Sequence, residues 1–152
     1  GGTCRVGVES TVLSVTGDTP IVLRAGGLAQ EDIEEHIGTV LRRTDISKQN
    51  EGPGMLPDHY APMTPLKLVD DIGEYMKSPK VGKLFFQRAD SASEGAVRVL
   101  SPHGDLREAA INLYHAMQEL DALHLNLIVA EFAPDHGLGR AINDRLQKAA
   151  QK

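Results

Sequence analysis

The alternation of apolar, strand-like runs with amphipathic, helix-like segments over residues 66–152 constrains the fold more than any other feature of the sequence. The run "LNLIVAEF" is nearly continuous in apolar residues, which is typical of a strand buried on both faces of a sheet. The pattern predicts strands at 66–69, 81–86, 96–100 and 125–132 and helices at 106–123 and 138–150. Strands separated by helices form parallel sheets, so we expect an α/β fold with a small Rossmann-like sheet covered by helices.

The helix at 106–123 carries the clearest periodic pattern of the chain. Its apolar stripe has spacings of 4, 3, 4 and 3, which favours a single buried face; the stripe consists of Leu106, Ala110, Leu113, Met117 and Leu120. Asp105 stands at the N-cap position with Glu108 three residues later, which predicts a capping box. A weaker helix is predicted through Tyr75 and Met76.

The first third of the chain has a different rhythm. Residues 5–15 predict one or two strands broken near Glu9 and Ser10, and a turn at 16–20 leads to a strand at 21–24 in a hairpin. A short helix is expected over about 30–37, ended by Gly38. Residues 39–51 show no pattern.

The stretch "GPGMLPDHYAP" at 52–62 contains three prolines and predicts a stiff, extended connector. We therefore expect a boundary between about 45 and 65, with one unit at 1–45, a linker at 46–65 and a second unit at 66–152. The linker carries the adjacent pair His59–Tyr60, and no second His or Cys stands at metal-ligand spacing from it.

Composition narrows the class of protein. The 152 residues have a net charge of −5, which argues against a dedicated nucleic-acid binder. A single cysteine, Cys4, excludes an internal disulfide and suits a reducing compartment. No run approaches the roughly 18 apolar residues that span a bilayer, so we expect a cytoplasmic protein without a membrane partner.

Four residues at three places in the sequence stand out by their chemistry, and each place has an ordinary structural alternative. Ser10 and Thr11, at a break between strand residues, could bind a polar substrate or be hydroxyls of a turn. Arg24 ends a strand before two glycines, which suits bidentate phosphate binding but also a surface salt bridge. Tyr60 could face a neighbouring site or anchor the linker by packing.

Other candidates are weaker. "GLGRA" at 137–141 opens the last helix and could hold an anion, but the dinucleotide-binding pattern belongs after the first strand of a βαβ unit, so a structural role is favoured. The scattered histidines are expected in solvent, and Lys80 and Lys83 form no patch. These residues alone support no particular reaction.

In order and spacing, "VGVESTV" at 6–12, "VLRAGG" at 22–27 and "PGM…HYAP" at 53–62 resemble the threonylcarbamoyl-AMP synthase family in its long form. That form joins a YrdC-type catalytic domain through a linker to a C-terminal accessory domain. The resemblance covers the whole chain, since "LSPHGDLREAAINLYHAMQELDAL" and "GLGRAINDRLQKAA" look like the accessory domain.

The resemblance implies a reaction in which L-threonine, bicarbonate and ATP form threonylcarbamoyl-AMP and pyrophosphate. The product serves modification of tRNA adenosine 37 by downstream transfer machinery. Mg²⁺ is expected with ATP, without a prosthetic group or direct tRNA binding. By motif, Ser10 matches a threonine-pocket residue, Arg24 a nucleotide-contacting arginine and Tyr60 a linker residue that reaches ATP. The linker would then close over the catalytic cleft and exclude water from labile intermediates.

The sequence departs from the family pattern in two places. The linker has Leu56-Pro57-Asp58 where the family often has a basic segment, and the family's Lys-x-Arg and Ser-x-x-Asn segments have no counterpart. We therefore expect 1–45 to be the end of a catalytic domain that is not a competent synthase alone, and to fold poorly without its sheet neighbours. The alternative functions are a regulatory or interaction module and an independent nucleotide-binding domain.

Overall fold

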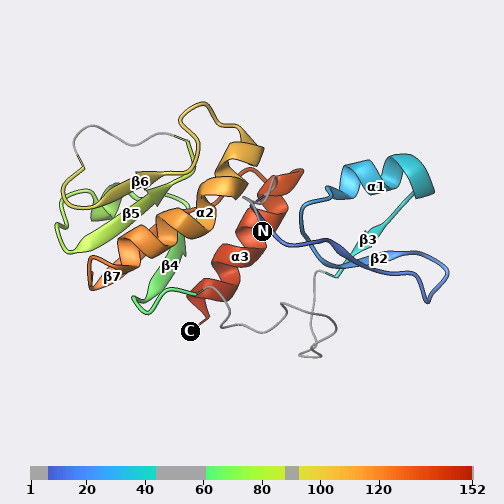
Figure 1. Cartoon of the computed structure of the whole chain (residues 1–152), viewed down its shortest axis with the longest axis horizontal. Coiled ribbons are helices and arrows are strands. Elements are labelled where there is room, and N and C mark those ends of the chain that lie inside the picture. Colours follow the sequence, from blue (N-terminus) through green and yellow to red (C-terminus); the bar gives the residue numbers. More distant parts are fainter. Residues whose placement is uncertain (1–6, 44–60, 88–92, 152) are drawn as a thin grey trace, which may run out of the picture.

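The computed structural model describes residues 7–43, 61–87 and 93–151. Figure 1 shows an N-terminal sheet with one helix at one end of the molecule and a larger α/β unit at the other, with α3 between them. The elements are β1 (Val12–Ser14), β2 (Ile21–Arg24), α1 (Gln30–Ile37), β3 (Leu41–Arg42), β4 (Leu66–Val69), η1 (Gly73–Tyr75), β5 (Val81–Phe85), β6 (Val97–Val99), α2 (Leu106–Asp121), β7 (Leu127–Glu131) and α3 (Leu138–Ala150). No helix among these is long and apolar enough to cross a bilayer.

The C-terminal unit, residues 61–151, is built on a four-stranded sheet in the order β4-β7-β5-β6. All three strand pairs are parallel, which confirms the predicted small parallel sheet. Its last strand, β7, inserts between β4 and β5, and its central residues Ile128, Val129 and Ala130 are fully buried. The continuous apolar run is thus explained by a central position between two neighbouring strands.

The two faces of this sheet are covered differently. Both α2 and α3 pack on one face, where their apolar stripes meet Leu84, Ile128 and Ala130 in the main core. The opposite face holds a smaller cluster around Ile72, Phe85 and Val129, next to the η1 segment. Where a weak helix was expected through Tyr75 and Met76, the chain makes a single 3-10 turn, too short to present a helical face.

The start of α2 matches half of the predicted capping box. The Asp105 carboxylate accepts a 2.6 Å hydrogen bond from the Glu108 backbone N–H. The reciprocal bond is absent from the described contacts, because the Glu108 carboxylate instead accepts from the Ser101 hydroxyl. The Ser101 Oγ in turn accepts the Asp105 N–H at 2.8 Å, so a buried serine links the two ends of the box.

The N-terminal unit, residues 7–43, is a three-stranded sheet in the order β1-β2-β3 with α1 packed against it. The β1–β2 hairpin and α1 confirm the expected elements, and Gly38 ends α1 with a positive φ of 80°. The strand predicted over 5–15 is shorter, because residues 7–11 are irregular and pairing begins at Val12. The prediction for 39–51 missed β3, whose two exposed residues pair in parallel with β2.

Lys83 is buried, which the sequence did not indicate. It stands inside β5, within the strand predicted at 81–86, and its side chain is fully buried. Its ammonium donates to the carbonyl of Ser78 at 2.6 Å and to that of Glu94, so the charge is held by backbone oxygens. Burial lowers the pKa of Lys83, and the charge of Glu94 opposes this shift.

Candidate functional site

The structure brings Ser10 and Arg24 together. Arg24, the last residue of β2, is buried, and its Nη2 donates to the Ser10 carbonyl at 2.9 Å and to the Ser10 hydroxyl at 3.2 Å. Its Nε donates to the same carbonyl at 3.2 Å, so one oxygen accepts hydrogen bonds from two groups of the guanidinium. Arg24 is therefore no surface group, while Ser10 itself is exposed.

Gly26 allows this approach. A Cβ on Gly26 would lie 2.3–2.4 Å from backbone atoms of residues 9–11, so only glycine fits where the two segments cross. The Gly27 N–H donates to the Glu9 carbonyl at 2.8 Å. The two backbone segments thus contact each other directly, which fixes the segment that carries Ser10.

Glu9, next to Ser10, makes a buried contact that the sequence analysis missed. Its Oε2 accepts from Arg145 Nε of α3 at 2.5 Å and from the Tyr114 hydroxyl of α2 at 3.3 Å. Arg145 Nη2 also lies 2.5 Å from this oxygen, but outside hydrogen-bonding geometry, so it contributes charge attraction. One sign of this pair was available: Arg145 interrupts the apolar face of α3 between Ile142 and Leu146.

The surroundings set the charge states of this cluster. Burial alone raises the pKa of Glu9, but the charge and hydrogen bonds of Arg145 outweigh it and hold the pKa below its usual value. Burial lowers the pKa of Arg145, and the carboxylates of Asp144 and Glu9 reverse this, leaving the pKa raised. Burial raises the pKa of Tyr114 to about 12. At neutral pH the cluster is therefore a carboxylate held by a guanidinium and a phenol.

Tyr60 and most of the linker predicted at 46–65 lie outside the described residues. The end of that linker is described, and it is tied to the C-terminal end of α2. The Asp121 carboxylate accepts the Met63 N–H at 3.0 Å and the Thr64 N–H at 2.7 Å. Burial opposes ionisation of Asp121, but these backbone donors hold its pKa below the usual range. The chain is thus anchored within four residues of Tyr60.

The start of α3 already has an anionic neighbour. The Gly137 N–H donates at 3.4 Å to Oε1 of Glu31 in α1, and Arg140 donates to the same oxygen at 2.7 Å. A Cβ on Gly139 would lie 1.9 Å from the Pro134 carbonyl oxygen, so this glycine is required by packing. These contacts favour a structural role for "GLGRA", in which the start of α3 binds α1 of the N-terminal unit.

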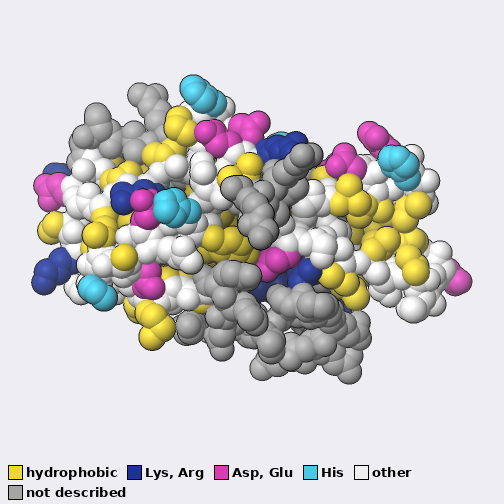
Figure 2. All heavy atoms as spheres, viewed as in Figure 1, with side chains coloured by type: hydrophobic (Ala, Val, Ile, Leu, Met, Phe, Trp, Pro, Cys, Tyr) yellow, Lys and Arg dark blue, Asp and Glu magenta, His cyan; other side chains and the backbone are white. Residues whose placement is uncertain are grey.

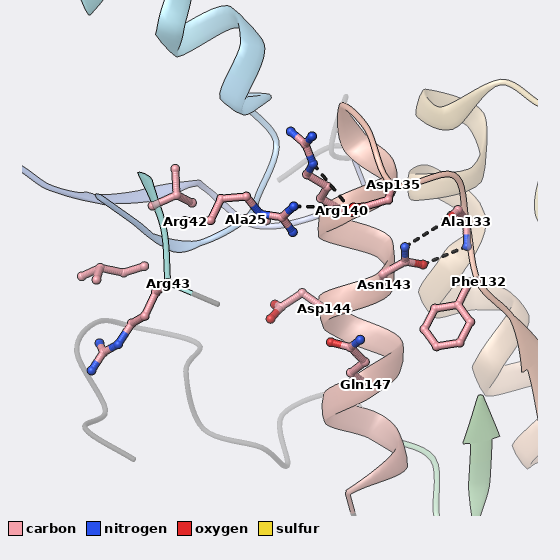
Figure 3. Close-up of a pocket in the computed structure, with 12 residues that line it drawn as sticks. Ala25, Arg42, Arg43, Phe132, Ala133, Asp135, Arg140, Asn143, Asp144 and Gln147 are labelled. Carbon is pink, nitrogen blue, oxygen red and sulfur yellow. Dashed lines mark hydrogen bonds and ion pairs between the residues drawn. The ribbon is translucent and has the colours of Figure 1, made fainter. Parts of the chain in front are cut away.

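A hollow of about 540 Å³ lies between β2 and β3 on one side and α3 on the other (Figure 3). Many of its polar side chains are paired with one another. Asp135 lies 3.6 Å from Arg42 and 3.7 Å from Arg140, and Asn143 bonds both backbone groups of Ala133 at 2.8 and 2.9 Å. Neither Ser10 nor Arg24 is among its lining residues, so the hollow is distinct from the Ser10–Arg24 pair.

Metal-ligating groups do not converge in the part of the chain that the structure describes. No three His, Cys, Asp or Glu side chains there are placed to hold a metal ion. The histidines outside the linker are exposed, at positions 36, 103, 115, 124 and 136. Among the described residues, the candidates for binding a ligand are therefore the buried Arg24, the exposed Ser10 and the cluster that holds Glu9.

Comparisons with known proteins point to a single family. A profile of the threonylcarbamoyl-AMP synthase C-terminal domain matches residues 28–151. A threonylcarbamoyl-AMP synthase of Bacillus subtilis is 39% identical over 163 residues, covering 99% of this chain and 47% of the relative. That of Pyrococcus abyssi is 32% identical, with 99% and 48% covered. The chain spans about half the length of these relatives.

Solved structures share the fold over nearly the whole chain. The crystal structure of P. abyssi Sua5 with L-threonine aligns with a TM-score of 0.80 at 32% identity, covering 99% of this chain and 48% of that one. A second P. abyssi Sua5 structure, of a variant with an adjacent histidine and tyrosine replaced by alanine, has a TM-score of 0.76 at 30% identity, with 97% and 46% covered. The chain belongs to the threonylcarbamoyl-AMP synthase family, of which it represents the C-terminal part.

Proposed function

We propose that this chain is the C-terminal part of an L-threonylcarbamoyladenylate synthase, which converts L-threonine, bicarbonate and ATP into threonylcarbamoyl-AMP and pyrophosphate. The product would serve threonylcarbamoyl modification of tRNA adenosine 37. The contact between Arg24 and Ser10 carries the proposal. This contact brings together two residues that are 14 positions apart in the sequence. The family resemblance assigns Ser10 to the threonine site and Arg24 to the ATP site.

Ser10 suits a substrate contact because the residue is exposed while its backbone is fixed. Arg24 holds the Ser10 carbonyl, and Gly26 leaves no room for that segment to move closer. A hydroxyl held on a fixed backbone can bond a polar substrate such as threonine with little loss of conformational freedom. The complex of P. abyssi Sua5 with L-threonine supports this choice of substrate.

Tyr60 would act from the linker. His59–Tyr60 is the one place in this sequence where a tyrosine directly follows a histidine. A P. abyssi Sua5 variant in which an adjacent histidine and tyrosine are replaced by alanine supports a role for such a pair. Asp121 holds the backbone at Met63 and Thr64, a few residues after Tyr60. This end of the linker would therefore stay in place while the linker closes. We propose that Tyr60 contacts ATP, carried with Mg²⁺, and helps to exclude water.

The N-terminal unit presents an apolar surface that the other part of a synthase could cover. A hollow of about 430 Å³ there is lined by Leu13, Leu28, Ile33 and Ile37 with a few polar neighbours. Figure 2 shows hydrophobic side chains gathered over this end of the molecule. Apolar patches of this kind mark contact surfaces. The half-length match to the relatives supports burial of this face in a larger catalytic domain.

The test is pyrophosphate release from ATP with L-threonine and bicarbonate. The chain alone and the same chain preceded by the N-terminal half of its relatives are compared. We expect activity in the longer protein only. Activity in neither, with both proteins folded, would overturn the proposal and favour the alternative of a regulatory or interaction module without catalysis of its own.

Single substitutions in the longer protein assign the residues. Ser10→Ala is expected to raise the KM for threonine tenfold or more, equivalent to roughly 1.4 kcal/mol. Ser14→Ala is the matched control, because the Ser14 hydroxyl bonds only the nearby Thr16 hydroxyl among the described contacts. Tyr60→Ala should instead raise the KM for ATP. Unchanged KM values for both substrates would remove these two residues from the site.

A further inference from the structure

Three consecutive residues of the N-terminal unit lie against the helices of the C-terminal unit. A Cβ on Gly7 would stand 2.2 Å from the Ile111 Cα of α2, and its φ of 73° also favours glycine. Val8 is buried in the main core of the C-terminal unit. Glu9 follows with its carboxylate on Arg145 and Tyr114. The chain is thus fixed to α2 and α3 immediately before Ser10.

The Glu9 contact is costly as a means of stability alone. Arg145 is 6% exposed, and withdrawing its charge and a carboxylate from water carries a large penalty that apolar residues of similar size would avoid. The ion pair fixes the position of the Glu9 carboxylate, because a guanidinium holds a carboxylate oxygen within a narrow range of positions. Asp144 accepts from Arg145 Nη1, which fixes the guanidinium from its other side.

This position is transmitted to Ser10 and Arg24 through short contacts. The Glu9 carbonyl accepts the Gly27 N–H at 2.8 Å, and the adjacent Ser10 carbonyl accepts from Arg24. Gly26 touches the backbone of residues 9–11 with no spare space. A shift of Glu9 therefore moves both segments that carry the proposed substrate-binding residues.

We propose that Arg145 and Tyr114 are positioning residues for the synthase reaction: by holding Glu9 they fix Ser10 and Arg24 in the geometry that binds threonine. This inference rests on the proposed function. It gives the accessory domain a specific role, in which two of its side chains complete the support of a site on the other unit. Neither residue needs to touch a substrate.

The kinetic test uses the longer protein with Arg145→Met, and with Glu9→Gln in case the first variant folds poorly. Arg145→Met should raise the KM for threonine at least tenfold while kcat at saturating threonine changes less than threefold. Arg145→Lys, which keeps the charge, should recover part of the loss. The matched control is Arg98→Met, which removes an arginine paired with Glu119 at 2.6 Å inside the C-terminal unit, and it should leave the KM unchanged.

A second measurement, independent of activity, follows amide hydrogen exchange of the 152-residue chain. Arg145→Met should speed exchange of the Gly27 N–H at least tenfold, whereas Arg98→Met should not. Normal exchange at Gly27 in Arg145→Met, or a threonine KM that Arg145→Met and Glu9→Gln both leave unchanged, would overturn the inference. If Gly27 responds but the longer protein lacks synthase activity, the proposed function has failed and the positioning of a synthase site fails with it.

Discussion

Residues 61–151 surround their parallel sheet with two apolar clusters, whereas residues 7–43 bury three apolar side chains of their own in one small cluster. The N-terminal unit instead exposes about half of each of Leu28, Ile37 and Leu41. Its other buried apolar side chain among the described residues, Val8, lies in the core of the other unit. We infer that the C-terminal unit is stable by itself. The N-terminal unit is instead stabilised by its contacts with the C-terminal unit, such as Glu9–Arg145, and these contacts set its position.

The strongest test of this comparison is to separate the two units. Residues 61–152 alone should unfold cooperatively in urea, because both sheet faces are covered within that segment. Residues 1–43 alone should show no cooperative transition, since three buried apolar side chains cannot offset the entropy of ordering the segment. Circular dichroism during a urea titration measures both outcomes. A cooperative transition in the N-terminal segment would contradict the comparison.

A core substitution in α2 should have the next largest effect. Leu113→Ala removes a fully buried side chain, and we expect a loss of about 2–5 kcal/mol in the free energy of unfolding. Ile37→Ala, at a side chain that is 52% exposed, should cost less than about 1 kcal/mol. Equal losses in the two variants would show that the N-terminal apolar face is covered in solution.

A glycine substitution should loosen the N-terminal unit alone. Gly26→Ala places a Cβ within 2.4 Å of three backbone atoms, so we expect a loss of about 1–3 kcal/mol. The effect should appear as faster amide exchange in residues 9–27, with the exchange of α2 unchanged. Gly17→Ala is the control, because its nearest neighbour would be 4.0 Å away. Loosening of α2 by Gly26→Ala would show that the units do not open separately.

The smallest predicted effect concerns alkaline pH and the contact between the units. The pKa of Tyr114 is raised to about 12, so the folded protein holds this proton more tightly than the unfolded chain, whose tyrosine titrates near 10. The stability due to this group is therefore present below pH 10 and is lost as the pH rises from 10 to 12. Thermal melts should show the wild type losing stability over this range relative to Tyr114→Phe, and parallel losses would count against the buried phenol.

The sequence predicted most of the elements because their patterns are local. The apolar stripe of α2, the strand β2 and the ends of α1 follow from periodicity, capping and Gly38, and all agree with the structure. The short strand β3 was missed because two exposed residues make no pattern, and its pairing with β2 is a tertiary contact. The linker function assigned to Tyr60 stays a prediction.

Local patterns in the sequence were enough to predict the α/β class and the parallel sheet of the C-terminal unit, and they singled out Ser10 and Arg24 as candidates. The fold was needed to show that β7 lies between β4 and β5, that Arg24 donates to Ser10, and that Arg145 reaches Glu9 across 136 residues of sequence. Periodicity and caps act within a few residues, whereas an ion pair depends on where distant segments pack. An arginine on the apolar face of a helix predicts a partner for its charge. The fold determines that this partner is Glu9.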